Sequence, residues 1–278
     1  MAAALVAGLF GLLIGSFLNV VVYRLPKMWQ REHENEVAEV TGQPPVHTDR
    51  FTLAVPRSAC PHCGHQITAL ENIPVISYVA LGGKCSACKA PISARYPVVE
   101  LAAGLLSALV IWHFGSGYAG LAALPFTYLL LAMSLIDFDT QYLPDDMTLP
   151  LLWGGLLVNL TGLFAPLEQA VIGAAAGYMI LWLINAAYKL VKRQEGMGGG
   201  DFKLLAALGA WMGWHALPAI ILLSSVVGAI VGIALIVFGK RTREVRIPFG
   251  PYLAAAGFIV LLYSKELTAL TQGFLQLG

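Results

Sequence analysis

The chain has 278 residues, of which 58% are hydrophobic and 12% are charged, and its mean hydropathy is +0.72. These values lie far outside the composition of soluble globular proteins and indicate a helical protein that crosses a membrane several times. The net charge of +1 gives no sign of a nucleic-acid or acidic partner.

Eight apolar stretches predict membrane spans at about 3–22, 98–114, 119–136, 147–164, 170–190, 202–214, 216–238 and 249–263. The first stretch is long and no basic residue precedes it, so we interpret it as an uncleaved span rather than a signal peptide. The only long polar segment, 26–97, separates the first two spans. We therefore expect an all-α polytopic membrane protein with about eight transmembrane helices and a small domain between helices 1 and 2.

The basic residues predict the orientation of the chain. If the N-terminus lies outside, sixteen of the seventeen lysines and arginines fall on the cytoplasmic side, and only Lys265 falls outside. Such an excess of basic residues is typical of cytoplasmic segments. This orientation predicts that segment 26–97, Asp137 and Asp201 all lie at the cytoplasmic face.

Two acidic residues stand at the ends of apolar stretches. Asp137 lies in IDFDTQYLPDD, and Asp201 follows the glycine-rich run GMGGG. Carboxylates at membrane depth are costly and usually persist for a function, so two on one side indicate an aspartyl catalytic dyad. We expect the glycines to let the backbone unwind near an extended substrate. The alternative is a solvated helix cap at Asp201; Asp139, Asp145 and Asp146 are expected to be loop or cap residues.

The predicted span after Asp201 is short. Its thirteen residues reach roughly 20 Å at about 1.5 Å per residue, whereas a bilayer core measures about 30 Å. The helix is therefore re-entrant, or its cytoplasmic end lies below the membrane surface. In such a recess two neighbouring carboxyl groups cannot both ionise easily, so they titrate as a unit. The ionised member would take a proton from water while the protonated member polarises the scissile carbonyl.

The four cysteines form two C-x2-C pairs separated by 21 residues. Paired knuckles of this kind suit tetrahedral thiolate binding of zinc, and disulfides are disfavoured on the cytoplasmic side. Iron or a redox pair are the alternatives. A closed four-thiolate site has no open position for chemistry, so we expect a structural metal. The predicted ligands are Cys60, Cys63, Cys85 and Cys88.

Other residues predict helix packing. Three glycine pairs at four-residue spacing indicate close helix contacts: Gly11/Gly15, Gly173/Gly177 and Gly228/Gly232. Ser16 and Asn19 are expected to bond to neighbouring helices, and Glu100, inside the second span, needs a partner or a cavity.

Two other classes of function fit less well. A proton-coupled transporter would need further acids or histidines toward the outer face, and the later spans offer almost none. A zinc-ribbon scaffold protein would leave both aspartates and the glycine run unexplained.

Six motifs, in order along nearly the whole chain, resemble those of the type IV prepilin leader peptidases: GSFLNVVVYRLP, CPHC…CSAC, RYPVVE, IDFDTQYLPD, GMGGGDFKLLAALGAW and IPFGPYLAAAG. The resemblance implies a bifunctional bacterial inner-membrane enzyme. Such enzymes cleave the short basic leader of prepilins and type II secretion pseudopilins, then N-methylate the new N-terminal residue with S-adenosylmethionine. By motif matching, the family's catalytic aspartates fall on Asp137 and Asp201, and its cysteine tetrad falls on the four cysteines above.

No residues for methyl transfer can be derived from the sequence, since no Rossmann-type fingerprint is present. The donor site is inferred from the resemblance, in or near 26–97, with Gly82 and Gly83 as candidates. A peptidase without methyltransferase activity is the alternative. The expected domains are the first helix (1–25), the zinc domain (26–97) and the peptidase domain (98–278). The expected partners are pilin substrates and lipid, with no nucleic acid; the oligomeric state is left open.

Overall fold

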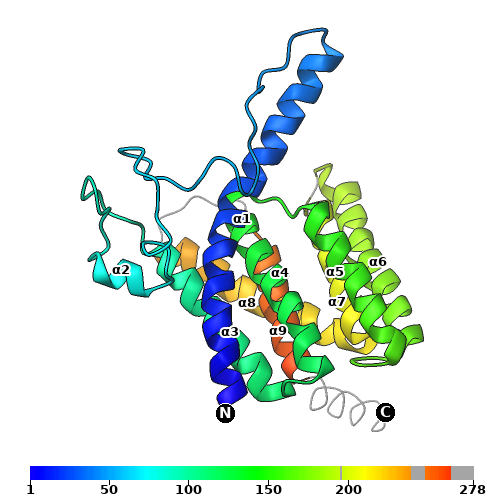
Figure 1. The fold of residues 1–278 in the computed structure, drawn as a ribbon. Helices are drawn as coiled ribbons and strands as arrows, with labels where there is room; N and C mark the ends of the chain where they lie inside the picture. Colours follow the sequence, from blue (N-terminus) through cyan, green and yellow to red (C-terminus); the bar gives the residue numbers. More distant parts are fainter. Residues whose placement is uncertain (195, 239–247, 264–278) are drawn as a thin grey trace, which may run out of the picture. The chain divides into compact units, whose positions relative to one another are not determined.

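A computed structural model describes residues 1–194, 196–238 and 248–263 (Figure 1). In these residues the chain forms nine α-helices and two short 3-10 helices, and it contains no β-strand. Five helical stretches are long and apolar enough to cross a membrane: α1 (Ala2–Val40), α3 (Arg95–Phe114), α4 (Tyr118–Thr140), α6 (Leu167–Lys192) and Trp214–Leu235, most of which is α8 (Leu217–Phe238). The predicted all-α membrane protein is confirmed.

Three further apolar helices are shorter than a typical span. They are α5 (Asp145–Val158), α7 (Gly199–Met212) and α9 (Gly250–Leu262), with 14, 14 and 13 residues. The expected number of eight spans therefore stays a prediction. Five basic residues used for the orientation, Lys240, Arg241, Arg243, Arg246 and Lys265, lie outside the described residues.

The chain divides into two compact units, Met1–Gly120 and Leu121–Gly278, which we describe separately. In the first unit α1 and α3 lie side by side (Figure 1). Gly15 permits this contact, because a Cβ atom there would lie 2.6 Å from the Cα of Glu100. The close packing expected at Gly11 and Gly15 is therefore confirmed. The predicted domain boundaries at 25 and 97 stay a prediction.

Polar side chains also join α1 to α3. The Asn19 side chain donates a hydrogen bond to the carbonyl of Tyr96 at 3.1 Å, and the Ser16 hydroxyl bonds to the carboxylate of Glu100. These contacts confirm that Ser16 and Asn19 bond to a neighbouring helix and that Glu100 has a partner.

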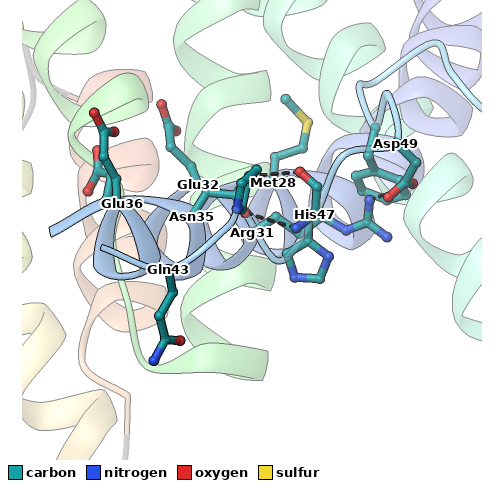
Figure 2. A pocket seen from close by; sticks show the side chains of 11 residues that line it. Met28, Arg31, Glu32, Asn35, Glu36, Gln43, His47 and Asp49 are labelled. Atoms are coloured by element: carbon teal, nitrogen blue, oxygen red, sulfur yellow. Dashed lines mark hydrogen bonds and ion pairs between the residues drawn. The ribbon is translucent and has the colours of Figure 1, made fainter. Parts of the chain in front are cut away.

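The C-terminal part of α1 continues as a polar helix, and residues 43–51 fold back along it (Figure 2). Arg31 donates a hydrogen bond to Asp49 at 2.8 Å, and Asn35 and His47 exchange two hydrogen bonds of 2.9 Å. A cleft of about 650 Å³ opens between this helix and the returning segment. The charged segment 31–39 is therefore a largely exposed helix face.

The core of the second unit is α7, around which α5, α6 and α9 pack. Every residue from Asp201 to Met212 is buried except Lys203. A helix that is apolar around its circumference belongs in the interior of a protein. Gly173 and Gly177 of α6 lie against the α7 backbone, which confirms the close packing expected there.

The last carbonyl groups of the short α7 helix are bonded by a buried asparagine from outside the helix, Asn159. The Asn159 side-chain amide donates hydrogen bonds to the carbonyls of Ala210 (2.9 Å) and Trp211 (2.8 Å). Its oxygen accepts hydrogen bonds from the backbone of Phe164 and Ala165. A bilayer supplies no water to the last carbonyls of a helix. Asn159 therefore explains how a helix of 14 residues can end inside the unit.

Candidate active site and metal site

Asp137 lies near the end of α4 and is 5% exposed. Its Oδ2 accepts a hydrogen bond of 3.0 Å from the backbone N–H of Gly250, the first residue of α9. Backbone N–H groups at a helix N-terminus stabilise negative charge. The start of α9 therefore forms one wall of the site around this carboxylate.

Asp201 lies in the first turn of α7 and is 9% exposed. The helix already begins at Gly199, and the backbone N–H of Asp201 donates to the carbonyl of Gly198 at 3.2 Å. The backbone is thus helical at Asp201 itself, and the expectation that the glycines let it unwind near a substrate stays a prediction. The alternative of a solvated helix cap is wrong, because the cap position belongs to Gly198 and Asp201 is buried.

Two glycines near the aspartates, Gly200 and Gly250, permit close packing. A Cβ atom at Gly200 would lie 2.6 Å from the Cβ of Leu143, and one at Gly250 would lie 3.0 Å from the Cδ1 of Leu143. Leu143, in the α4–α5 connection, thus packs against the starts of both α7 and α9. Asp137 is close enough to Asp201 for their charges to interact. The structure therefore brings the two predicted aspartates together.

The neighbouring acids have other contacts. Asp145, in the first turn of α5, accepts two hydrogen bonds from Lys203 of α7 at 2.6 and 2.7 Å. Asp146 lies in the same helical turn, whereas Asp139 is exposed on α4. Sequence reasoning missed Gly250, although the Gly250-Pro251 pair at the start of the last predicted span was a signal for a helix start.

The four cysteines form one cluster in the first unit. Their sulfur atoms all lie within 4.8 Å of one another, and all four thiols are free. The two knuckles share one backbone pattern: the N–H groups of Cys60 and Cys85 donate to the carbonyls of His65 and Ala90 at 2.9 and 2.8 Å. Gly64 and Lys89, at equivalent positions, both have positive φ, 72° and 62°.

The chemistry of the cluster fits a metal ion. Backbone N–H groups of His62 and Cys63 hydrogen-bond the sulfur of Cys60 and lower its pKa to about 7. The N–H groups of Cys88 and Ala87 likewise lower the pKa of Cys85. The thiolate is the form of cysteine that binds metals. The four sulfur atoms lie close enough together to hold one metal ion, and zinc suits four sulfur ligands.

His65 lies outside the cysteine cluster, and its ring nitrogen takes part in a hydrogen-bond network with Glu71 and Ser86. Its Nε2 lies 3.2 Å from both Glu71 and the hydroxyl of Ser86. Hydrogen bonds from Ser86 and Thr68 lower the pKa of Glu71 to about 2, so this carboxylate stays ionised at neutral pH. The network ties the two knuckles together around the cluster.

Gly82 and Gly83 form the turn between α2 (Ile76–Ala80) and the second knuckle. Both have positive φ, 62° and 67°, which favours glycine. A Cβ atom at Gly83 would lie 3.0 Å from the Tyr78 ring, whereas one at Gly82 would have no neighbour within 4 Å. The turn thus explains both glycines without a ligand, and only Gly82 leaves its backbone open to one.

Comparison with known proteins assigns the family. Residues 9–114 match the Bacterial Peptidase A24 N-terminal domain, and residues 124–233 match the Type IV leader peptidase family. The chain belongs to the type IV leader peptidase family. The first match contains the four cysteines, and the second contains Asp137 and Asp201.

Full-length relatives share this assignment. Prepilin leader peptidase/N-methyltransferase from Stutzerimonas stutzeri is 56% identical over 270 residues, which cover 97% of this chain and 93% of the relative. The proteins of the same name from Aeromonas salmonicida and Pseudomonas aeruginosa are also 56% identical, over 94% of this chain and 90% of their own length. No solved structure matched the chain.

Proposed function

We propose that this protein cleaves the leader peptide of type IV prepilins and type II secretion pseudopilins, and then N-methylates the new N-terminal residue. The observation that carries the proposal is the meeting of Asp137 and Asp201 around Leu143 and Gly250. The names of the relatives support both activities. The protein is thus a membrane protease and a methyltransferase.

The proposed cleavage reaction uses the two carboxyl groups as a general base and a general acid. One carboxylate removes a proton from water as the water attacks the scissile carbonyl. The other, in its protonated form, donates a hydrogen bond to the carbonyl oxygen, where negative charge develops. It then supplies the proton that the departing amine needs. No covalent intermediate with the enzyme forms.

The hydrogen bond from Gly250 supports an assignment of the two roles. A backbone N–H donor stabilises an ionised carboxylate more than a neutral carboxyl group. We therefore assign Asp137, which accepts this bond at 3.0 Å, as the base and Asp201 as the acid. The main-chain donor also fixes the orientation of the Asp137 carboxylate, which general base catalysis requires.

The proposed methyl transfer belongs to the first unit. S-adenosylmethionine supplies an activated methyl group to the neutral amine of the cleaved pilin, and the protein must hold the two in line. Gly82 and Gly83 are the proposed donor-binding positions, and Gly82 has the open backbone. The metal is proposed to be a structural zinc, held by Cys60, Cys63, Cys85 and Cys88.

The helices indicate a membrane protein, and we propose the bacterial inner membrane with the N-terminus periplasmic. One assay with purified protein in detergent tests both activities. A prepilin is added with methyl-labelled S-adenosylmethionine, and leader loss and methyl incorporation are followed together. We expect cleavage first and label on the mature pilin afterwards. Cleavage without label would leave a peptidase only, and an intact prepilin would contradict the proposal.

A further inference from the structure

A strained turn in the first unit is bonded to a side chain of a membrane helix. Val75 has φ 62° and ψ −49°, and the N–H of Ile76 donates to the carbonyl of Pro74 at 2.6 Å. This is a γ-turn of the rare, strained form, which is unusual for a β-branched residue. The N–H of Val75 donates to Oε2 of Glu100 at 2.8 Å. The buried carboxylate therefore holds the turn against α3.

The position of Glu100 fixes the level of this turn along α3. Glu100 lies five residues after Arg95, the first residue of α3, which is about 7.5 Å along the helix axis at about 1.5 Å per residue. The surface of α3 near this level carries exposed apolar side chains, with Val98 60% and Leu105 70% exposed. Because α3 is long and apolar enough to cross a membrane, lipid suits this exposed apolar surface.

The segment around the turn exposes its own apolar side chains. Leu70, Ile73, Ile76 and Val79 are 77%, 39%, 66% and 71% exposed. They repeat every three residues, and Ile76 and Val79 share one face of α2. Four large apolar side chains are thus exposed to solvent within ten residues, which is energetically unfavourable in water. Exposed apolar patches of this kind mark interaction sites.

We propose that segment 69–81 lies in the lipid interface at the α3 N-terminal end, with Leu70, Ile73, Ile76 and Val79 inserted among the acyl chains. The hydrogen bond from Val75 to Glu100 holds the patch against α3, a helix long and apolar enough to cross a membrane. In Figure 1 α2 lies beside α3 and across the direction of α1, as an interfacial helix would.

Basic side chains near the segment fit a phospholipid surface. Lys84 and Lys89 follow α2 and are exposed, and cations there attract the anionic head groups of the cytoplasmic leaflet. Lipid therefore satisfies both features of this surface, the apolar side chains and the charges beside them. The second cysteine pair of the metal site, which begins at Cys85 only a few residues after Val79, is in consequence held next to the bilayer.

Photo-crosslinking to lipid tests the proposal on the full chain. A benzophenone amino acid replaces Val79, and the purified protein is placed in vesicles of phosphatidylethanolamine and phosphatidylglycerol that contain radiolabelled phospholipid. Val46 is the matched control, because it is also an exposed valine (61%) but lies beside His47, which bonds to Asn35 in the polar part of α1. Leu105 on the outer surface of α3 is the positive control.

We expect lipid labelling from position 79 to be about fivefold or more above that from position 46 and similar to that from position 105, because only positions 79 and 105 would share the bilayer. Metal content verifies that each variant is folded, and replacement of Ile76 serves if the Val79 variant loses metal. Labelling from the tested position no higher than that from Val46 would overturn the proposal. So would crosslinks from it to peptides of this chain or of a second copy.

Discussion

The backbone N–H of Gly250 lies 3.0 Å from Oδ2 of Asp137, although the two residues are separated by 113 positions in the chain. This contact joins the end of α4 to the start of α9. The same glycine packs against Leu143, which also touches Gly200 beside Asp201. The positions of the two proposed catalytic residues thus depend on Gly200 and Gly250, where a side chain would collide with Leu143.

Gly250→Ala is expected to impair cleavage while the protein stays folded. A Cβ atom at this position would lie 2.6 Å from Oδ2 of Asp137, so the carboxylate must shift. Since a displacement of about 1 Å can cost about 100-fold in rate, we expect kcat for leader cleavage to fall by about 10- to 100-fold. Gly154→Ala is the control, because its Cβ would lie 3.7 Å from Trp211 and fits. Equal activity of the two variants would contradict this role of Gly250.

Removal of one cysteine is expected to release the metal. The purified protein should contain about one zinc ion, bound by thiolates at ~2.3 Å. Cys63→Ser or Cys88→Ser should lower the zinc content measured by mass spectrometry and destabilise segment 26–97, because metal binding is coupled to folding in such small sites. Ala87→Ser, in the same knuckle, should keep the metal, since Ala87 contributes no side-chain ligand. A stoichiometric disulfide in protein isolated without oxidation would contradict the metal site.

Asn159→Leu is expected to destabilise the second unit. The substitution leaves the carbonyls of Ala210 and Trp211 without their side-chain donor in an apolar interior. Unsatisfied buried groups cost about 1–3 kcal/mol each, so the thermal unfolding midpoint in detergent should fall by several degrees. Thr161→Ala, at an exposed residue nearby, should change the midpoint little. An unchanged midpoint in the Asn159 variant would show that other groups satisfy these carbonyls.

The two activities are expected to separate. Asp137→Asn and Asp201→Asn should still methylate a pilin that has already lost its leader, because methyl transfer needs a neutral amine in line with the donor and no carboxylate dyad. The measurement is transfer of labelled methyl from S-adenosylmethionine to mature pilin. Gly82→Ala should reduce this transfer and leave cleavage intact. Loss of methylation in both aspartate variants would indicate one shared site.

The sequence predicted the helical class because an apolar stretch of about 20 residues has the length of a transmembrane helix. It also predicted the cysteine cluster, because the ligand spacing lies within two short knuckles and needs no knowledge of the tertiary fold. The pairing of Asp137 and Asp201 was predicted from their positions at the ends of apolar stretches on one face and from the family resemblance, yet their proximity depends on Leu143 and on the start of α9. Contacts over such sequence distances leave no periodic signal.

The structural role of the glycine run, in contrast, could not be predicted from the sequence. Glycine permits both an unwound backbone and a close approach, and the sequence does not distinguish them. The structure assigns Gly200 to close approach, since the helix already begins at Gly199 and Leu143 occupies the space of a side chain. Asn159 was missed for a similar reason: its four hydrogen bonds reach residues about fifty positions away as well as its own loop.

The most direct test of the proposed mechanism is leader cleavage by aspartate variants in detergent. Asp137→Asn and Asp201→Asn should each abolish cleavage of a purified prepilin while zinc content and thermal unfolding stay those of the unaltered protein. Asp139→Asn makes the same chemical change two residues along α4, at an exposed position, and should cleave normally. Full cleavage by either the Asp137 or the Asp201 variant would remove that residue from the catalytic pair and contradict the account.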